Sequence, residues 1–339
     1  MKNVNFAIIG TGSIVELHIE SIKEIDNATV VALCSSNEAR AKEAEEKYNI
    51  PCYSSLASLF ANEKIDAISI CTYSGNHLEP CVEAAKRGIH VITEKPLEVT
   101  LDRADQMINA CKENNVKFAC IFQSRFKPDY LKLKSAIEDG KLGKLILGNA
   151  YIKWFRSEDY YAGSNWRGTM KGDGGAALIN QGIHTIDLLL SLMGDVKSIV
   201  GKVKTTLHDI EGEDLGVAIL DFQNGATGVI EGSTALYPGY PERLEIYGEH
   251  GSVILEGGKI TSWNLKGDTT KASSPQESDS GSSDPMSISY KYHKLQLSDF
   301  VESIIHDKKP LITGEEGRPA LEVIKTIYKS SESNREIEL

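Results

Sequence analysis

Short apolar runs alternate with longer helical patterns between residues 4 and 122, and this rhythm constrains the fold more than any other feature. The apolar runs predict buried parallel strands at Val4–Ile9, Thr29–Cys34, Ala67–Thr72, His90–Thr93 and Lys117–Phe122. Helical patterns lie between them at Ile14–Ile25, Glu38–Tyr48, Asn76–Arg87 and Leu101–Asn114. Because strands that alternate with helices fold into right-handed βαβ units, the sequence predicts a doubly wound parallel α/β sheet of the Rossmann type.

The rhythm changes after about residue 125, where strand-like runs follow one another directly. They lie at Leu145–Phe155, Ser198–Thr206, Leu215–Phe222, Ala226–Thr234, Glu242–Gly248 and Ser252–Leu255. Helices are predicted at about Gly174–Met193, Leu295–His306 and Arg318–Ser330. Successive strands with segregated helices indicate an α+β domain on a large open, mostly antiparallel sheet. A chain of 339 residues suits two domains, which we place at residues 1–122 and 123–339.

Composition narrows the class of protein further. Acidic residues outnumber basic ones by 48 to 37, which argues against a partner with a phosphate backbone. No apolar stretch approaches the roughly 20 residues that span a bilayer, and no signal-peptide core precedes the first strand. The six cysteines form no CxxC pair, so we expect reduced thiols and a cytoplasmic protein. The eight histidines show no metal-binding spacing, and Lys266–Ser287 reads as a surface loop.

The first predicted strand runs into the glycine-rich turn Gly10-Thr11-Gly12-Ser13-Ile14. Gly10 permits a tight turn, Gly12 lets the backbone approach a pyrophosphate, and the amides of the following helix face the phosphates. Val15 stands where the dinucleotide fingerprint has a third small residue. A bare GxG also connects strands to helices without a ligand, but its place at the first βα junction predicts a dinucleotide site.

The end of the second strand bears on the choice between NAD and NADP. It reads Ser35-Ser36-Asn37, without the acid that would bind the ribose of NAD. Glu38 could substitute, although Ser35 and Glu38 also form a capping-box pattern that would turn Glu38 back to the helix start. The small hydroxyl side chains, with Arg40 nearby, could bind a 2′-phosphate. The alternative, that Arg40 is an ordinary solvent-exposed helix residue, has nearly equal support. We therefore lean slightly to NADP.

Two clusters carry candidate acid–base groups. Glu94-Lys95-Pro96 follows a predicted strand at the sheet edge where such folds bind ligands, although a solvated loop lysine explains Lys95 equally well. Asn180, His184 and Asp187 fall at i, i+4 and i+7 of a predicted helix, on one face. A histidine there suits removal of a hydroxyl proton, but a lone histidine is more often structural.

Taken in order, these motifs resemble the glucose–fructose oxidoreductase/inositol dehydrogenase family, often written Gfo/Idh/MocA. The matching motifs are the GxG turn, Thr72-x-x-x-x-His77, Glu94-Lys95-Pro96, Phe122-Gln123-Ser124-Arg125-Phe126 and Gly174-Gly175…His184-x-x-Asp187. They cover nearly the whole chain in the family's order. The resemblance implies an NAD(P)-dependent dehydrogenase or reductase that moves a hydride to or from a hydroxyl-bearing carbon of a sugar, polyol or nucleotide-sugar.

The resemblance also implies roles for particular residues. Lys95 would bind the reacting hydroxyl next to a cis peptide bond to Pro96, and His184 would be the general base, with Asn180 beside it. The cofactor would contact Gly10, Thr11, Gly12, Ser13, Ile14, Ser35, Ser36, Arg40, Thr72, His77, Glu94, Lys95, Gln123, Trp166 and Arg167. Tyr160 and Tyr161 could stack on a sugar or simply pack. Relatives form dimers or tetramers through the C-terminal sheet, so a homo-oligomer is expected.

The sequence departs from the family pattern in three respects. Tyr73 and Ser74 replace the usual Pro-Asn, and Val15 replaces an alanine. Asn180 stands where polyol dehydrogenases of the family carry aspartate, which resembles members that act on nucleotide-linked or N-acetylated sugars. Two alternatives stay open: an NAD-dependent glycosidase of the same fold, and a regulator of sugar metabolism that binds NAD(P) without catalysis.

Overall fold

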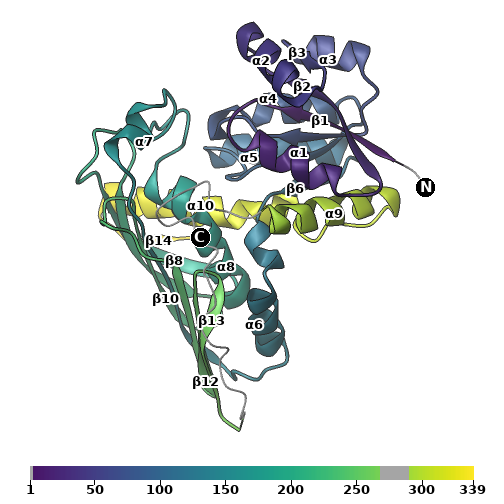
Figure 1. Cartoon of the computed structure of the whole chain (residues 1–339). Coiled ribbons are helices and arrows are strands. Elements are labelled where there is room, and N and C mark those ends of the chain that lie inside the picture. The colour runs from purple at the N-terminus through teal and green to yellow at the C-terminus, as the bar shows by residue number, and fades with distance from the viewer. Residues whose placement is uncertain (1–2, 268–289) are drawn as a thin grey trace. The chain divides into compact units, whose positions relative to one another are not determined.

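The computed structural model describes residues 3–267 and 290–339, which form two compact units (Figure 1). The N-terminal unit comprises Met1–Gln123 with Tyr290–Arg318, and the C-terminal unit comprises Ser124–Ser289 with Pro319–Leu339. The predicted division after residue 122 differs from this one, because residues 290–318 group with the N-terminal unit. Residues 268–287 of the predicted loop Lys266–Ser287 lie outside the described residues.

A six-stranded parallel sheet in the order β3-β2-β1-β4-β5-β6 is the centre of the N-terminal unit. Its strands are β1 Val4–Ile9, β2 Ala28–Cys34, β3 Cys52–Tyr53, β4 Ala67–Ile70, β5 His90–Thr93 and β6 Phe118–Cys120. This order confirms the predicted doubly wound sheet and is the one found in dinucleotide-binding folds. The two-residue strand β3 is too short to show as an apolar run, so the sequence did not indicate it.

Helices connect these strands. They are α1 Val15–Lys23, α2 Glu38–Tyr48, α3 Leu56–Asn62, α4 Leu78–Ala85 and α5 Leu101–Glu113, with short 3-10 turns η1 Ser74–Asn76 and η2 Gln123–Phe126. Ser35 and Glu38 do not form the capping box that their spacing allows. Asn37 caps α2 instead, because the helix begins at Glu38 and the Asn37 Oδ1 accepts the Arg40 backbone N–H at 3.0 Å.

The helix α9 Lys291–Ile305 belongs to the N-terminal core although it comes from the far end of the chain (Figure 1). Phe300 of α9 packs on Phe6 of β1 with ring centroids 6.4 Å apart. The apolar side chains Leu297, Val301 and Ile304 are buried in the same core. The sequence shows that one face of this helix is apolar, but not which sheet that face covers.

The C-terminal unit is built on an eight-stranded sheet in the order β13-β12-β11-β7-β10-β9-β8-β14. Its strands are β7 Leu145–Lys153, β8 Val196–Lys204, β9 Leu215–Phe222, β10 Thr227–Ser233, β11 Arg243–Gly248, β12 Gly251–Glu256, β13 Lys259–Leu265 and β14 Ile337–Glu338. Among the described strands of this sheet, β7 and β10 are the one parallel pair, so the predicted mostly antiparallel sheet is confirmed.

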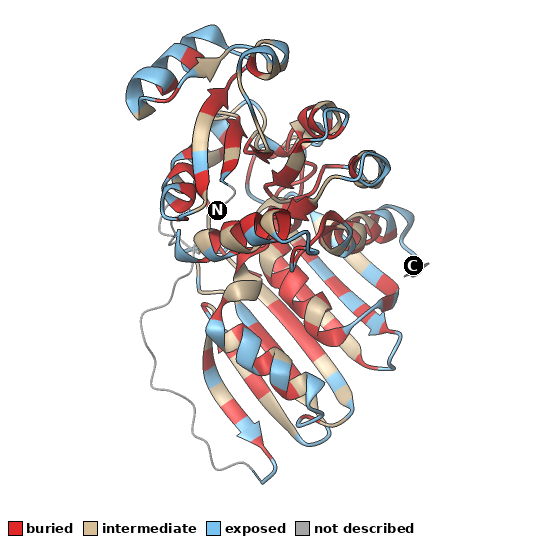
Figure 2. Cartoon of the chain, turned by 90° about the vertical axis from the view of Figure 1, so that its right-hand side faces the viewer, coloured by how far each residue is buried: buried red, intermediate tan, exposed pale blue. Residues whose placement is uncertain are grey.

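Helices pack on one face of this sheet. The unit contains α6 Pro128–Glu138, α7 Glu158–Ala162, the π-helix η3 Ala177–Gly182, α8 Ile183–Met193 and most of α10 Gly314–Ser333. Buried and exposed residues alternate along β9, and such bands are visible across the sheet in Figure 2. Small residues allow close packing on the helix side: a side chain on Gly216 would meet Leu178 Cδ1 at 2.6 Å.

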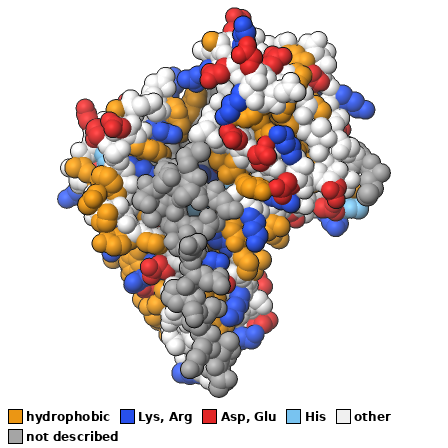
Figure 3. Space-filling model, viewed as in Figure 1, with side chains coloured by type: hydrophobic (Ala, Val, Ile, Leu, Met, Phe, Trp, Pro, Cys, Tyr) orange, Lys and Arg blue, Asp and Glu red, His pale blue; other side chains and the backbone are white. Residues whose placement is uncertain are grey.

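The other face of the sheet carries an apolar row. Val200, Ile219 and Val229 are cross-strand neighbours on β8, β9 and β10, and Val200 and Ile219 are 49% and 53% exposed. Figure 3 shows hydrophobic side chains gathered along the left flank of the C-terminal unit. Within residues 3–267 and 290–339, no helix combines the length and apolar character that crossing a membrane requires.

The α9 helix should stabilise the N-terminal sheet through one buried amide as well as through its apolar face. Gln296 accepts the Phe122 backbone N–H at 3.0 Å and donates to the Cys120 carbonyl at 2.7 Å. Replacing Gln296 with leucine removes both bonds, so we expect the free energy of unfolding to fall by about 2–4 kcal/mol. Urea denaturation measures this change.

The neighbouring Leu295 provides a matched control because it is 42% exposed. Leu295→Ala should lower the free energy of unfolding by less than about 1 kcal/mol. Equal losses in Gln296→Leu and Leu295→Ala would show that the Gln296 amide bonds do not stabilise the unit.

Candidate functional site

The glycine-rich turn after β1 has the conformation that the sequence predicted. Gly10 has φ +108°, and a Cβ there would lie 2.6 Å from the Cys71 carbonyl oxygen, so only glycine fits. A Cβ on Gly12 would meet nothing within 4 Å. Gly12 and Ser13 are exposed, whereas Thr11 and Ile14 are half-buried, and α1 starts immediately afterwards. The turn therefore presents an open backbone surface at a helix N-terminus, as phosphate binding requires.

The residues that follow β2 divide into two groups. Ser35 is buried and its hydroxyl lies 3.3 Å from Thr11 Oγ1 and 3.4 Å from the Asn37 backbone nitrogen. Its hydrogen bonds therefore tie the glycine-rich turn to β2. Ser36 and Arg40 are exposed.

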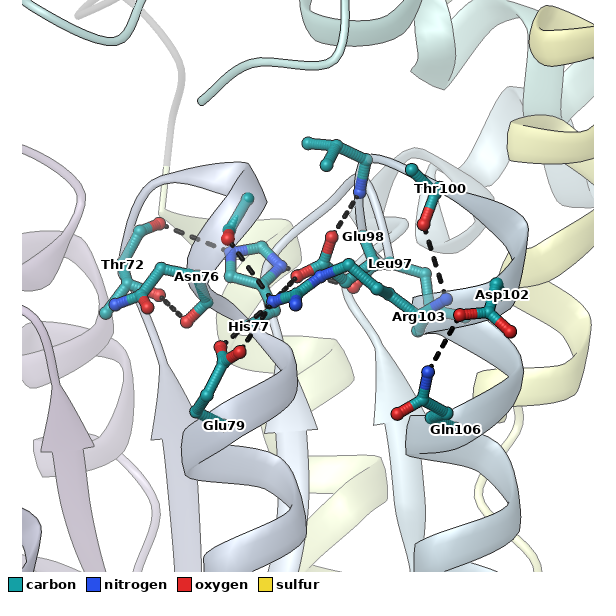
Figure 4. A network of polar contacts seen from close by, with 12 residues as sticks. Thr72, Asn76, His77, Glu79, Leu97, Glu98, Thr100, Asp102, Arg103 and Gln106 are labelled. Carbon is teal, nitrogen blue, oxygen red and sulfur yellow. Dashed lines mark hydrogen bonds and ion pairs between the residues drawn. The ribbon is translucent and has the colours of Figure 1, made fainter. Parts of the chain in front are cut away.

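His77 ties together the loops that follow β4 and β5 (Figure 4). Its Nδ1 faces the Pro96 and Leu97 carbonyl oxygens at 3.0 and 3.3 Å, and its Nε2 faces the Thr72 carbonyl oxygen at 3.3 Å. Thr72 in turn donates its hydroxyl to the Asn76 carbonyl at 2.9 Å. Burial lowers the pKa of His77, which favours the neutral ring. The arrangement fixes the backbone around Lys95-Pro96, whose peptide bond is cis as the resemblance implied.

A second set of polar contacts, which was not predicted from the sequence, lies one residue further along the same loop. Glu98 is fully buried, accepts the Val99 backbone N–H at 2.6 Å and pairs with Arg103 Nη2 at 2.9 Å. Arg103 also pairs with Glu79 of α4 at 2.9 Å (Figure 4). An acid close behind the Glu94-Lys95-Pro96 motif is visible in the sequence, but nothing there shows that it is buried.

Glu94 lies in a buried cluster with two histidines. Its Oε1 lies 2.9 Å from His18 Nε2 and 3.5 Å from His293 Nε2, while its Oε2 accepts the Lys95 backbone N–H at 3.2 Å. Ser69 Oγ lies 2.9 Å from His18 Nδ1. One nitrogen each of His18 and His293 and one oxygen of Glu94 lie within 4.8 Å of one another, and two histidines with a carboxylate could also bind a metal cation. The separation of His18 Nε2 and Glu94 Oε1 is that of a hydrogen bond, so we assign the contact to a proton.

The second candidate cluster lies at the start of a helix in the C-terminal unit. The sequence predicted one α-helix from Gly174, but residues 177–182 form a π-helix and α8 begins at Ile183. Glu213 holds this start by accepting the backbone N–H groups of Ala176 and Leu178 at 3.1 and 2.7 Å. The α-helical spacing that placed Asn180 and His184 on one face therefore does not apply between them.

Asn180 and Asp187 each have a charged neighbour. Asp187 forms a bidentate pair with Arg125 at 2.6 and 2.8 Å, so it anchors α8 to η2. Asn180 Nδ2 donates to Asp173 Oδ1 at 2.5 Å, and Asn180 Oδ1 accepts from Gln181 at 2.9 Å. The sequence analysis missed Asp173, which is buried in the glycine-rich loop before the helix. A carboxylate therefore stands one hydrogen bond away from the neutral amide of Asn180.

The aromatic residues near this helix have different surroundings. Tyr161 is buried and its hydroxyl lies 2.8 Å from Thr234 Oγ1, so it packs in the unit. The Tyr160 ring faces the Arg167 guanidinium at 4.3 Å, and its hydroxyl accepts from Gln181 at 2.9 Å. The Arg167 guanidinium also lies 5.5 Å from the Trp166 ring.

Gln123 is the last residue of the first segment of the N-terminal unit and lies buried at the start of η2, three residues after β6. Among the described residues, its Oε1 has no hydrogen-bond partner. A buried amide oxygen without a partner is uncommon, and it leaves an acceptor at the carboxyl end of the sheet.

Comparison with known proteins agrees with this architecture. Residues 4–122 match the model of the Gfo/Idh/MocA oxidoreductase family with an NAD-binding Rossmann fold, and residues 130–254 match the C-terminal domain model of that family. Myo-inositol 2-dehydrogenase of Thermotoga maritima is 28% identical over 352 residues, covering 99% of this chain and 98% of the relative.

Solved structures give the same result. The WlbA dehydrogenase of Bordetella pertussis, in complex with NADH and UDP-GlcNAcA, is 30% identical with a TM-score of 0.89, covering 100% of this chain and 99% of that one. WlbA of Chromobacterium violaceum, with the same two ligands, is 28% identical with a TM-score of 0.88, covering 100% and 96%. With both of its units matched, the chain belongs to the Gfo/Idh/MocA family of oxidoreductases.

Proposed function

We propose that this chain is an NAD(P)-dependent dehydrogenase that transfers a hydride between nicotinamide C4 and a hydroxyl-bearing carbon of a sugar, with Lys95 and His184 as the acid–base pair. One observation carries the proposal. The open turn at Gly10 and Gly12 and the loop that holds Lys95 follow β1 and β5 at the same carboxyl edge of one parallel sheet. That edge is where open α/β sheets bind their ligands.

The proposed chemistry divides the two hydrogens of a secondary alcohol. Bound NAD(P) would supply the acceptor for the hydride that leaves the carbon carrying the hydroxyl. Lys95 donates a hydrogen bond to the hydroxyl oxygen and holds it in place. His184 accepts the hydroxyl proton as the carbonyl forms, a role that suits an imidazole. In the reverse direction, the same groups return the proton to the oxygen.

We propose a nucleotide-linked sugar as the substrate class. The neutral Asn180 differs from the aspartate of polyol dehydrogenases, and its amide is held between Asp173 and Gln181. The two WlbA relatives carry a nucleotide sugar, UDP-GlcNAcA, in their structures. A polyol is the competing substrate class, because the Thermotoga relative is named for inositol.

The adenosine end of the cofactor site supports a slight preference for NADP. Residues 35–37 include no carboxylate that could bind a ribose 2′-hydroxyl, and Arg40 is exposed in the first turn of α2. An arginine so placed can bind a 2′-phosphate. The WlbA structures contain NADH. The affinities of this chain for NADH and for NADPH must therefore be compared.

We also propose that the protein forms a homo-oligomer through the open face of its C-terminal sheet. The row of Val200, Ile219 and Val229 is apolar, and an exposed apolar sheet face is typical of an interface.

The described cysteines are free thiols, with Cys81 Sγ and Cys111 Sγ only 3.5 Å apart, which suits a reducing cytoplasm.

The acid–base assignment predicts a loss of turnover without a loss of cofactor binding. Lys95→Met and His184→Gln should each lower kcat by about 10²–10⁴-fold. Steady-state kinetics with UDP-sugars and polyols measures turnover, and tryptophan fluorescence measures cofactor binding. The exposed Lys42 and His306 provide controls, since Lys42→Met and His306→Gln should keep full activity. Full turnover in both active-site variants would refute the assignment. A tightly retained cofactor without net turnover would point instead to the glycosidase alternative.

The cofactor assignment predicts a selective effect at Arg40. Arg40→Gln should weaken NADPH binding by about tenfold, because one charge-assisted contact to the 2′-phosphate is lost, while NADH binding stays unchanged. Fluorescence titration with both cofactors measures the two dissociation constants. The exposed Lys42, two residues further along the same helix, is the control. Equal effects of Arg40→Gln on both cofactors would remove the basis for an NADP preference.

The oligomer assignment predicts dissociation when charge enters the apolar row. Ile219→Lys should shift the molecular mass measured by light scattering toward a smaller species, because a lysine cannot be buried there unpaired. Leu311→Lys is the control, since Leu311 is similarly exposed at 53% but lies in the N-terminal unit. A wild-type monomer at micromolar concentration, or an unchanged oligomer in Ile219→Lys, would contradict this interface.

A further inference from the structure

The buried cluster around Glu94 contains two histidines that the proposed chemistry does not use. His18 lies on α1, one turn after the glycine-rich turn, and His293 lies on α9. Both are almost fully buried, at 0% and 2% exposure. Because these two rings are shielded from solvent, we infer their function from the protein groups that they contact.

Both oxygens of the Glu94 carboxylate are engaged. Oε1 faces His18 Nε2 at 2.9 Å and His293 Nε2 at 3.5 Å, and Oε2 accepts the Lys95 backbone N–H at 3.2 Å. The His18 ring is itself fixed by Ser69 of β4, whose Oγ lies 2.9 Å from Nδ1. A chain of contacts thus runs from β4 through His18 and Glu94 to the backbone of Lys95.

The charges in this cluster are complementary. Burial works against a charged His18, but the Cys71 thiol and the Glu94 carboxylate more than offset it and raise the pKa of His18 to about 10. Burial likewise opposes ionisation of Glu94, yet the two histidines hold its pKa well below its ordinary value. Burial lowers the pKa of His293, and the nearby charges of His18 and Lys95 lower it further. At neutral pH the cluster holds an imidazolium, a carboxylate and a neutral imidazole.

Stability alone does not explain a buried ion pair. Removing two charges from water has a large free-energy cost, and apolar residues of similar volume often stabilise a core equally well. Directed hydrogen bonds give something that apolar packing does not, namely one fixed rotamer. The group that is fixed here, Glu94, is bonded to the residue that carries the proposed acid–base function.

We propose that His18 and His293 are positioning residues for Lys95. From α1 and α9 they hold the Glu94 carboxylate in one orientation, and that carboxylate holds the Lys95 backbone amide. The Lys95 side chain therefore leaves its loop in one direction relative to the glycine-rich turn of the same unit. This inference rests on the proposed role of Lys95 in hydride transfer.

Two substitutions of His18 separate the contact to Glu94 from the contact to Ser69. The amide nitrogen of glutamine reaches the place of Nε2, so His18→Gln can still donate to Glu94. The amide of asparagine reaches only the place of Nδ1, so His18→Asn can bond Ser69 but not Glu94. We expect kcat to fall by about 10²-fold in His18→Asn and by less than about fivefold in His18→Gln, since small misplacements of catalytic groups have effects of that size.

A double-mutant cycle tests whether His18 acts through Lys95. In a Lys95→Met background, His18→Asn should change the residual kcat by less than about threefold, because the group that it positions is already absent. Thermal unfolding of each variant establishes that it is folded. Equal losses of kcat in His18→Gln and His18→Asn, or a full additional loss in the Lys95→Met background, would overturn the inference.

Nuclear magnetic resonance of ¹⁵N-labelled histidine tests the cluster without reference to activity. His18 should keep both ring nitrogens protonated up to about pH 9, and its pKa should fall in Glu94→Gln. Because the folded pKa lies above the unfolded one, the stability that His18 contributes should be complete below pH 6.5 and lost as the pH rises toward 10. A His18 ring without a proton on Nε2 at pH 7 in the wild-type protein would refute the inference, because that nitrogen could not donate to Glu94. Full turnover in Lys95→Met would refute the proposed function instead, and leave this signal unchanged.

Discussion

The close approach of Gly10 to the Cys71 carbonyl is the constraint on which the N-terminal unit depends. It occurs where β1 and β4 end side by side, and no side chain fits between the two backbones. Because all six strands are parallel, the loops after β1, β2, β4 and β5 must emerge at this same edge. The glycine-rich turn therefore shares the edge with the loop that carries Glu94 and Lys95, and a cofactor bound at the turn would meet that loop.

Buried carboxylates hold irregular backbone in each of the two units. Glu98 binds the Val99 N–H in the loop after β5, and Glu213 binds two amides at the start of the π-helix. Asp214 accepts the backbone N–H groups of Thr206, Leu207 and His208, all at 3.0 Å or less. Each of these loops lacks the regular hydrogen bonds of a helix or strand, so a carboxylate supplies the acceptors instead.

The sequence predicted the parallel strands well and the polar contacts poorly. Val4–Ile9 and His90–Thr93 match β1 and β5 residue for residue, because strands buried on both faces are short and largely apolar runs. The Gly10 turn was predicted for the same kind of reason, since its conformation demands glycine. The place of α9 was not predicted, because an apolar helix face is compatible with either sheet. Asp173 and Glu98 were missed because a carboxylate reads as a surface residue until its burial is known.

Asp173, the hydrogen-bond partner of Asn180, restricts which residue types can occupy position 180. The Asn180 amide nitrogen donates to Asp173 and its amide oxygen accepts from Gln181, so both ends of the side chain are oriented by the protein. An aspartate at position 180 would place two carboxylates at hydrogen-bond distance, and one of them would have to take up a proton. Asn180 and Asp173 are therefore coupled: the buried acid beside the helix is compatible with a neutral residue at 180. The residue type at position 180 is therefore constrained by a buried partner that the sequence pattern does not display.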